Sequence, residues 1–355
     1  MAKELWKGNE AIAQAAIRAG CDCFFGYPIT PQNEIPEYMS LHMPKLGRVF
    51  VQSESEVAAI NMVYGAASSG KRAMTSSSSP GVSLKQEGIS YLAGAELPAV
   101  IVNVMRGGPG LGSIQPSQAD YYQATRGGGN GDYRTIVLAP CNIQEAVDLT
   151  QEAFDLADCY RNPVVVLADG MIGQMIEPIE WHDIPKRELP PKDWAASGRN
   201  GRAHNNFVTS LFIEAQACEE HDLAIQAKYD LIEEREIRWE EKNTQDCQVL
   251  LVAYGTPSRI AMSAIEQLAE RGVKAGLFRP ITLWPFPYAA LKKAASQASV
   301  QAVLTVEMSL GQMVDDVRLA VEGEKPVYFE GRAGGSIPTL TQIVDAAERA
   351  LKGGK

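Results

Sequence analysis

The chain has 355 residues, of which 33 are basic and 43 acidic, so its formal net charge is −10 at pH 7. Hydrophobic residues make up 45% and charged residues 21% of the sequence. These values are ordinary for a globular protein and exclude a disordered or collagen-like chain. An acidic chain without a basic run lacks the charge pattern of a nucleic-acid binder and of a protein held at an anionic membrane.

We expect a cytoplasmic protein. The N-terminal residues carry charge but no apolar segment like that of a secretory signal. The longest apolar runs are strand-sized, well short of the ~20 residues that span a bilayer. Six cysteines are scattered along the chain, the usage typical of reduced thiols in the cytosol.

Helical and strand-like segments alternate over the first half of the sequence. The expected order is helix 9–20, strand 21–27, strand 48–52, helix 54–70, strand 72–77, helix 82–96, strand 98–106, strand 135–140, helix 142–160 and strand 162–169. Apolar strands separated by helices indicate a parallel sheet covered on both faces. Ligands of such a sheet bind beyond the C-terminal ends of its strands.

The rest of the chain falls into two parts. Residues 181–245 contain prolines, a polar stretch and then a charged helix, expected at 224–242, and we interpret them as a linker. Farther on, strands are expected at 249–254, 274–280, 302–308 and 326–331, and helices at 259–272 and 337–353, with Ser258 as a possible N-cap. The predicted domains are therefore residues 1–180 and a smaller α/β domain at 246–355.

Three polar side chains fall at the C-terminal ends of predicted strands. Thr30 lies between two prolines, Glu54 is expected in the first turn of a helix, where the dipole favours its charge, and Arg106 ends the most apolar strand. A guanidinium at that place is suited to hold a carboxylate through two parallel hydrogen bonds. A proline-rich turn and an ordinary helix start capped by Ser53 remain open as the non-functional alternatives.

A metal site is not expected in this chain. Its four histidines lie far apart, and Cys21 and Cys23 do not have the spacing of a zinc or iron–sulfur motif. The glycine-rich run 107–112 follows a strand without matching a dinucleotide-binding motif, and we interpret it as a loop whose backbone approaches a ligand closely.

Taken together, these motifs resemble the α-subunit of the 2-oxoacid:ferredoxin oxidoreductases. The matching segments are 27–31, 52–54, 78–81, 106–110 and 128–140 in the first half and 249–259, 279–287 and 306–321 in the second. The resemblance covers nearly the whole chain. The segment 108–125 is most similar to the branched-chain (2-oxoisovalerate) members, and 2-oxoglutarate members remain an alternative.

The resemblance implies two doubly wound, mostly parallel α/β domains: a thiamine-diphosphate-binding fold and a transketolase C-terminal-like domain. It also implies oxidative decarboxylation of a branched-chain 2-oxoacid to acyl-CoA and carbon dioxide, with electrons passed to an external ferredoxin. Thiamine diphosphate and coenzyme A are the expected cofactor and co-substrate.

Partner chains are expected because this sequence lacks the diphosphate-binding signature and the cluster cysteines of the family. The resemblance places the diphosphate and Mg²⁺ site on a β-subunit. It places 4Fe–4S clusters on that subunit and on a small ferredoxin-like (γ) subunit. The thiamine diphosphate pocket would then be shared between two chains.

The resemblance also suggests roles for individual residues. Glu54 matches the glutamate that binds the pyrimidine N1′ and activates the cofactor, and Glu56 ranks second. The remaining matches are Pro28 at the cofactor and Ile29, Thr30, Ser79 and Arg106 at the substrate, with Arg106 on its carboxylate. The sequence departs from the family pattern at Gln32 and Asn33, which replace small serines at the expected pocket rim.

Two other functions remain possible at this point. One is a transketolase-like or dehydrogenase-type thiamine enzyme, which passes its acyl group to a sugar or to lipoamide. The other is a non-enzymatic nucleotide-binding scaffold.

Overall fold

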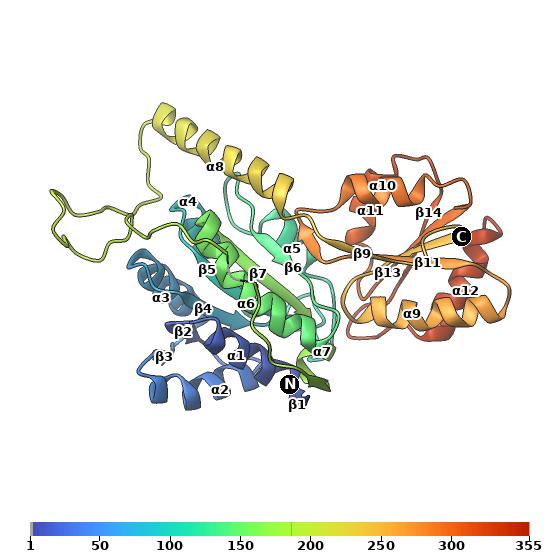
Figure 1. Cartoon of the computed structure of the whole chain (residues 1–355), viewed down its shortest axis with the longest axis horizontal. Coiled ribbons are helices and arrows are strands. Elements are labelled where there is room, and N and C mark those ends of the chain that lie inside the picture. The colour runs from blue at the N-terminus through green and yellow to red at the C-terminus, as the bar shows by residue number, and fades with distance from the viewer. Residues whose placement is uncertain (1–2, 186, 355) are drawn as a thin grey trace.

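The computed structural model describes residues 3–185 and 187–354, and it has two lobes, each built on a mainly parallel sheet (Figure 1). The strand order of the first sheet is β12–β6–β7–β5–β4–β2–β3, and only β12 is antiparallel to its neighbour. The strands are β2 (Cys23–Gly26), β3 (Val49–Gln52), β4 (Ala73–Ser77), β5 (Ala99–Met105), β6 (Ile136–Leu138), β7 (Pro163–Asp169) and β12 (Thr282–Trp284).

Helices cover both faces of this sheet, as the sequence predicted. On one face lie α1 (Gly8–Arg18), α2 (Glu34–His42), α6 (Ile143–Tyr160) and α7 (Gly170–Gln174), and on the other α3 (Glu56–Ser68), α4 (Ser79–Gly94) and α5 (Tyr121–Arg126). This division follows from right-handed crossovers between parallel strands. A short strand, β1 (Glu4–Lys7), pairs with β8 (Ile176–Ile179) beside α1, and a 3₁₀ turn, Pro44–Leu46, follows α2.

The core of the first lobe is centred on β5 and β7. Every residue of these two strands is buried, and they pair in parallel along their full lengths. Their runs of valine and isoleucine fit this position, because β-branched side chains pack well when both faces of a strand are covered. This core fixes the C-terminal ends of the strands, where the sequence predicts Thr30, Glu54 and Arg106.

The middle of the chain differs from the expected linker. The helix α8 begins and ends earlier than predicted, at Ala215–Arg235, and residues 239–242 form a strand, β9 (Trp239–Lys242), in the second sheet. The helix packs on the first lobe through Ile225, Tyr229 and Ile232. The segment before it extends away from the body of the molecule (Figure 1).

The second lobe contains the sheet β14–β13–β10–β11–β9. Its other strands are β10 (Val249–Val252), β11 (Ala275–Pro280), β13 (Ala302–Glu307) and β14 (Val327–Gly331), and its helices are α9 (Gly255–Glu270), α10 (Tyr288–Ala295), α11 (Met313–Val321) and α12 (Leu340–Leu351). The prediction that Ser258 caps α9 is wrong, because the helix begins at Gly255 and the Ser258 hydroxyl donates to the Gly255 carbonyl oxygen at 2.7 Å.

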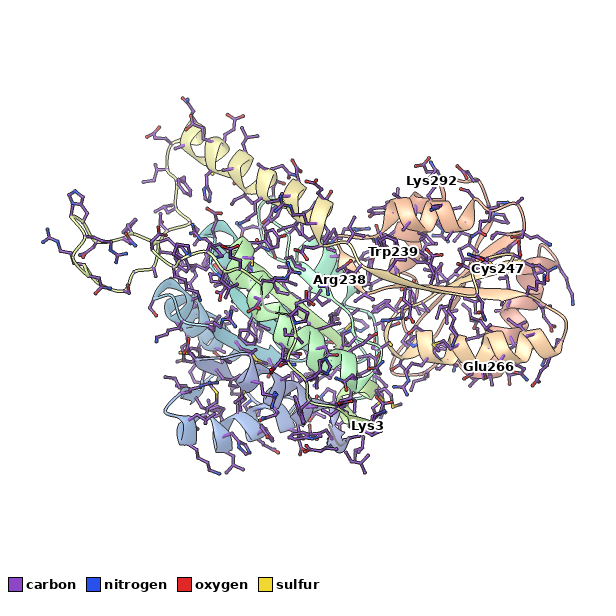
Figure 2. All side chains as sticks on the ribbon, viewed as in Figure 1. Lys3, Arg238, Trp239, Cys247, Glu266 and Lys292 are labelled. Carbon is purple, nitrogen blue, oxygen red and sulfur yellow. The ribbon has the colours of Figure 1, made fainter. Side chains whose placement is uncertain are left out.

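The two lobes exchange secondary structure across the predicted boundaries. Strand β12 comes from the second half of the chain but pairs with β6, while β9 precedes residue 246 and joins the second sheet. Figure 2 shows Arg238 and Trp239 at this junction. A buried ion pair between Arg279 and Glu145, at 2.6 Å, also crosses the interface.

Two properties bear on the expected location. Within the described residues, none of the helices combines the length and the apolar character that crossing a membrane requires. The six cysteines are all free thiols, and four of them are buried.

Candidate active site

The loop after β2 forms one wall of the candidate site. Pro31 is buried, and its carbonyl oxygen accepts hydrogen bonds from the side-chain amides of Asn9, at 2.7 Å, and Gln174, at 2.6 Å. These bonds fix the loop against α1 and α7, while Pro28 and Thr30 remain exposed. The Thr30 hydroxyl has no hydrogen-bond partner in the described part of the chain, so it is available to a ligand.

Arg106 follows β5 and links the loop after β2 to the loop after β5. Its Nη1 donates a hydrogen bond to the Thr30 carbonyl oxygen at 2.9 Å, and its Nη2 donates one to the Leu111 carbonyl oxygen at 3.0 Å. Its Nε is buried without a partner among residues 3–185 and 187–354. The structure thus brings Thr30 and Arg106 together and leaves the Nε hydrogen unpaired.

Ser79, the first residue of α4, holds the backbone rather than lining a pocket. Its hydroxyl donates a hydrogen bond to the Asp120 carboxylate at 2.6 Å. The same hydroxyl oxygen accepts a hydrogen bond from the Arg106 backbone N–H at 3.0 Å. Its own backbone N–H donates to Asn103 Oδ1 at 3.2 Å. The Ser79 hydroxyl is therefore already committed within the protein.

The turn between β3 and α3 separates the two glutamates. The helix begins at Glu56, and the Ser55 hydroxyl caps it by accepting a backbone N–H of the first turn at 3.2 Å. The expectation of Glu54 in the first turn behind a Ser53 cap is therefore wrong, since the Ser53 hydroxyl instead donates to the Ser55 carbonyl oxygen at 2.8 Å. Glu54 is exposed, whereas Glu56 keeps only 7% of its surface accessible.

The Glu56 carboxylate lies at the C-terminal end of β4. A Cβ added to Gly81 would lie 2.7 Å from Glu56 Oε1 and 2.2 Å from Ser77 Oγ, so the missing side chain makes room for both groups. The hydroxyls of Ser77 and Ser78 are buried and lack hydrogen-bond partners within the described chain. Buried polar groups are normally paired, so these hydroxyls fit a bound polar ring. Residues 3–185 and 187–354 contain no cluster of side chains that could bind a metal ion.

Lys85 lies next to this carboxylate and was not singled out by its sequence pattern. Its side chain is fully buried on α4, and its Nζ donates to Thr75 Oγ1 at 3.1 Å. Burial lowers the pKa of Lys85 to about 8, and the charge of Glu56 opposes that shift. No local signal could have revealed this lysine, because lysines on exposed helix faces have the same sequence pattern.

A pocket of about 330 Å³ opens beside Thr30. Its lining residues are Thr30, Pro31, Asn33, Glu34, Ile114, Gln115, Pro116, Gly170, Met171 and Gln174. Of the two positions that depart from the family pattern, Asn33 reaches this pocket. Gln32 is fully buried instead, and the Ser76 hydroxyl donates to its side-chain oxygen at 2.5 Å.

Glu34 gives the pocket a negatively charged wall. Burial alone would raise the pKa of Glu34, but hydrogen bonds from Lys7, at 2.5 Å, and Asn9, at 2.7 Å, lower it. It is the one charged residue among those that line the pocket. The remaining walls combine amides with the apolar side chains of Ile114 and Met171.

Comparisons with known protein families match both lobes. A family profile described as "Pyruvate flavodoxin/ferredoxin oxidoreductase, thiamine diP-bdg" matches residues 14–242, and one described as "Pyruvate:ferredoxin oxidoreductase core domain II" matches residues 247–343. The ketoisovalerate oxidoreductase subunit VorB of Methanothermobacter thermautotrophicus is 52% identical over 97% of both chains. The 2-oxoglutarate synthase subunit KorA of the same organism is 39% identical over 96% of both.

Solved structures resemble the whole chain. The 2-oxoglutarate:ferredoxin oxidoreductase from Magnetococcus marinus, whose structure holds 2-oxoglutarate, coenzyme A and succinyl-CoA, superposes with a TM-score of 0.86 at 25% identity, and the match covers 98% of this chain and 65% of that one. A split-gene transketolase superposes with a TM-score of 0.61 at 16% identity, which supports the fold alone. The expected combination of a thiamine-diphosphate-binding fold with a transketolase C-terminal-like domain is confirmed.

Proposed function

Because this chain belongs to the 2-oxoacid:ferredoxin oxidoreductase family, we propose that it is the subunit that holds the 2-oxoacid and the pyrimidine ring of thiamine diphosphate in a branched-chain enzyme. The assembled enzyme converts 2-oxoisovalerate and coenzyme A to acyl-CoA and carbon dioxide and passes two electrons to ferredoxin. The identity of 52% to ketoisovalerate oxidoreductase subunits supports this substrate.

The buried carboxylate at the end of β4 carries the proposal. Thiamine diphosphate, when bound, supplies the nucleophilic carbon that adds to the 2-oxo group and allows carbon dioxide to leave. We assign the pyrimidine contact to Glu56, which would hold a proton at N1′, and we keep Glu54, the residue that the resemblance selects and that is exposed in the isolated chain, as the alternative. Burial supports this assignment, because a charge–dipole or proton-sharing contact is stronger where water is excluded. Ser77 and Ser78 offer further hydrogen bonds to the ring.

Arg106 and Thr30 would bind the substrate. The unpaired Nε hydrogen of Arg106 suits the carboxylate of the 2-oxoacid, and the free hydroxyl of Thr30 suits the 2-oxo oxygen. Pro28 and Ile29 belong to the same loop and would contact the cofactor and the substrate, respectively. Ser79 would act at a distance, by fixing the backbone of Arg106.

The pocket favours an aliphatic side chain over a second carboxylate. The pocket lining offers no cation to pair with the distal carboxylate of 2-oxoglutarate, because its one charged residue is Glu34, which forms an ion pair with Lys7 at 2.5 Å. The apolar surfaces of Ile114 and Met171 would instead bury an isopropyl group, which favours binding. A branched-chain substrate is therefore the better fit.

The chain functions within a multi-subunit enzyme, since its relatives are named as subunits. We infer that a β-subunit supplies the diphosphate and Mg²⁺ site, and that 4Fe–4S clusters lie on this chain's partners, including a small ferredoxin-like subunit. Coenzyme A would reach the site as co-substrate, and external ferredoxin would receive the electrons. The free thiols support a reducing, cytoplasmic setting.

The test uses the complex of this chain with its partner chains. Reduction of a viologen dye by 2-oxoisovalerate, 2-oxoglutarate and pyruvate, each with coenzyme A, gives kcat/KM for every acid. We expect 2-oxoisovalerate to be preferred. A clear preference for 2-oxoglutarate would overturn the substrate assignment, and inactivity with all three acids would overturn the function.

Paired variants test the catalytic glutamate. Glu56→Gln should lower kcat by at least about 100-fold, a typical loss for a proton-handling group. Glu54→Gln, two residues away and exposed, is the matched control and should stay within about threefold of the wild type, as surface substitutions usually do. The opposite pattern would restore Glu54 as the activating residue.

A further inference from the structure

Residues 117–122 form a short connection, here called the strap, which the second lobe holds firmly. The strap residue Gln118 is fully buried. Its Nε2 donates to the Tyr254 carbonyl oxygen at 2.9 Å, and its Oε1 accepts the Met308 backbone N–H at 3.0 Å. Its backbone N–H donates to the Met308 carbonyl oxygen at 2.8 Å. One side chain and its backbone therefore attach the strap to two strand ends of the other sheet.

Residues on both sides of Asp120 repeat this attachment. The side-chain amide of Gln312 donates to the Ala119 carbonyl oxygen at 2.7 Å and accepts the Tyr122 backbone N–H at 2.9 Å. The Tyr121 hydroxyl donates to the buried Asp316 at 2.6 Å. Asp120 thus lies between bonds to the second lobe, while its own side chain turns towards the first.

The Asp120 side chain belongs to a closed ring of hydrogen bonds in the first lobe. Its Oδ2 accepts the Ser79 hydroxyl at 2.6 Å and the Asn103 side-chain amide at 2.9 Å. A hydroxyl has one hydrogen to donate, so the Ser79 oxygen meets Arg106 as the acceptor of its backbone N–H, at 3.0 Å. The Asn103 oxygen closes the ring by accepting the Ser79 backbone N–H.

We propose that the strap allows the second lobe to position Arg106 for the 2-oxoacid carboxylate, and that Asp120 is the positioning residue that passes this constraint through Ser79. The inference rests on the proposed role of Arg106. Its guanidinium is held by the Thr30 and Leu111 carbonyl oxygens, so the direction of the free Nε hydrogen depends on where the Arg106 backbone lies. Displacements of about 1 Å are enough to spoil a hydrogen-bonded binding geometry.

A carboxylate at this place needs an explanation beyond packing. Asp120 has no ion-pair partner in the part of the chain that the structure describes, and burial raises its pKa although the bonds from Ser79 and Asn103 oppose that rise. Burying a carboxyl group without a cation costs stability. In return, the Asp120 carboxylate accepts one hydrogen bond from Ser79, which contacts the Arg106 backbone, and one from Asn103, which accepts the Ser79 backbone N–H.

The experiment measures KM and kcat of the assembled complex for Asp120→Ala and Gln312→Ala. Each variant should raise KM for the 2-oxoacid by about tenfold while kcat changes less than about threefold and KM for coenzyme A stays constant, the pattern of a lost binding contact. The conservative Asp120→Asn keeps an oxygen for both donors and should remain near the wild-type KM. An unchanged KM in both Asp120→Ala and Gln312→Ala overturns the proposal.

A double variant separates this proposal from the function on which it rests. If Asp120 acts through Arg106, then Asp120→Ala should add little to the KM of Arg106→Lys, and additive effects would contradict the inference. An unchanged KM in Arg106→Lys alone would instead refute the proposed role of Arg106. If Asp120→Ala does not fold, the same cycle is run with Gln312→Ala, which removes no group from the ring in the first lobe.

The matched control breaks a different contact between the lobes. Glu145→Ala removes the ion pair with Arg279 on another part of the interface. It should lower the melting temperature but leave KM for the 2-oxoacid unchanged. A rise in KM equal to that of Gln312→Ala would show that any loosening of the interface has this effect, and the specific role of the strap would be lost.

Discussion

Arginine and lysine differ at the substrate end of the site. Arg106→Lys keeps the positive charge but loses the planar fork that reaches the Thr30 and Leu111 carbonyl oxygens and leaves Nε for the substrate. We expect KM for the 2-oxoacid to rise about tenfold with little change in kcat, because a lysine ammonium has no planar fork with which to contact both carbonyl oxygens and still direct an N–H at the substrate. Steady-state kinetics of the complex measure this change, and an unaltered KM would remove Arg106 from the site.

The buried Lys85 predicts how stability depends on pH. Its pKa is about 8 in the folded chain against 10.5 when unfolded, so the unfolded state binds more protons between these values and stability rises with pH there. Lys85→Met removes this dependence. The free energy of unfolding of Lys85→Met minus that of the wild type should therefore fall by roughly 3 kcal/mol from pH 8 to pH 10.5.

Urea unfolding of the isolated chain at several pH values measures that difference. Taking the variant as the reference cancels the tyrosines, which titrate in the same range. Lys45→Met is the control, because Lys45 is an exposed lysine. A constant difference between Lys85→Met and wild type across this range would mean that Lys85 titrates normally.

The two glutamates show where sequence reasoning on single residues succeeds and fails. The motif places both glutamates at the start of α3, and Arg106 donates a hydrogen bond to the Thr30 carbonyl oxygen at 2.9 Å at another edge of the site. The resemblance selected Glu54 and ranked Glu56 second, and it carried no information on which of the two is buried, because Ser53 and Ser55 both have acceptable spacing for a helix cap. Only the packing of α3 against Gly81 buries one glutamate and exposes the other.

At the scale of elements, the helix pair α3 and α4 exposes large apolar side chains close to Glu56. Val57 is 44%, Met62 38% and Leu84 55% exposed. Exposed apolar groups beside the proposed cofactor site indicate the surface on which a partner chain would bind. We therefore expect Leu84→Glu to weaken binding of the β-subunit at least about tenfold, because a charge would be buried on association.

Titration of the purified chains, followed by light scattering or fluorescence, gives the dissociation constant. Leu319→Glu is the matched control, since Leu319 is 61% exposed on α11 in the other lobe. Equal affinities for the Leu84→Glu variant and the wild type would place the β-subunit elsewhere.

Elements that local sequence determines were predicted correctly, whereas elements that depend on contacts between distant residues were missed or misplaced. Strands β5 and β7 were predicted because long β-branched runs have few alternatives. The helix α8 was predicted too far along the chain because its charged sequence favours a helix at both positions. The strand β9 was missed because it forms only when the edge of β11 is available to pair with it. The pairing of β12 with β6 joins residues far apart in sequence and leaves no local signal.

At the scale of the whole molecule, one buried carboxylate accepts hydrogen bonds from both lobes. Asp316 is fully buried and accepts hydrogen bonds from the hydroxyls of Tyr121 and Tyr288 and from Arg126, the last at 3.0 Å. Asp316→Ala leaves these donors without their acceptor, which should cost about 1–3 kcal/mol for the buried Tyr121 hydroxyl alone. Thermal unfolding should show a large fall in melting temperature.

The control for this variant lies on the surface. Asp345 is half-exposed on α12 and pairs with Arg271 at 3.9 Å, so Asp345→Ala should cost less than about 1 kcal/mol. Similar losses of stability in the two variants would mean that the Asp316 network contributes nothing special to the joining of the lobes.

The strand β12 also limits how the gene for this protein can be divided. Because Thr282–Trp284 closes the edge of the first sheet, a chain cut in the segment between β9 and β10 would leave β6 without its neighbour and open to pairing with other molecules. A fission product ending there should aggregate unless the missing half is co-expressed. The two lobes of this chain are therefore expected to fold as one unit.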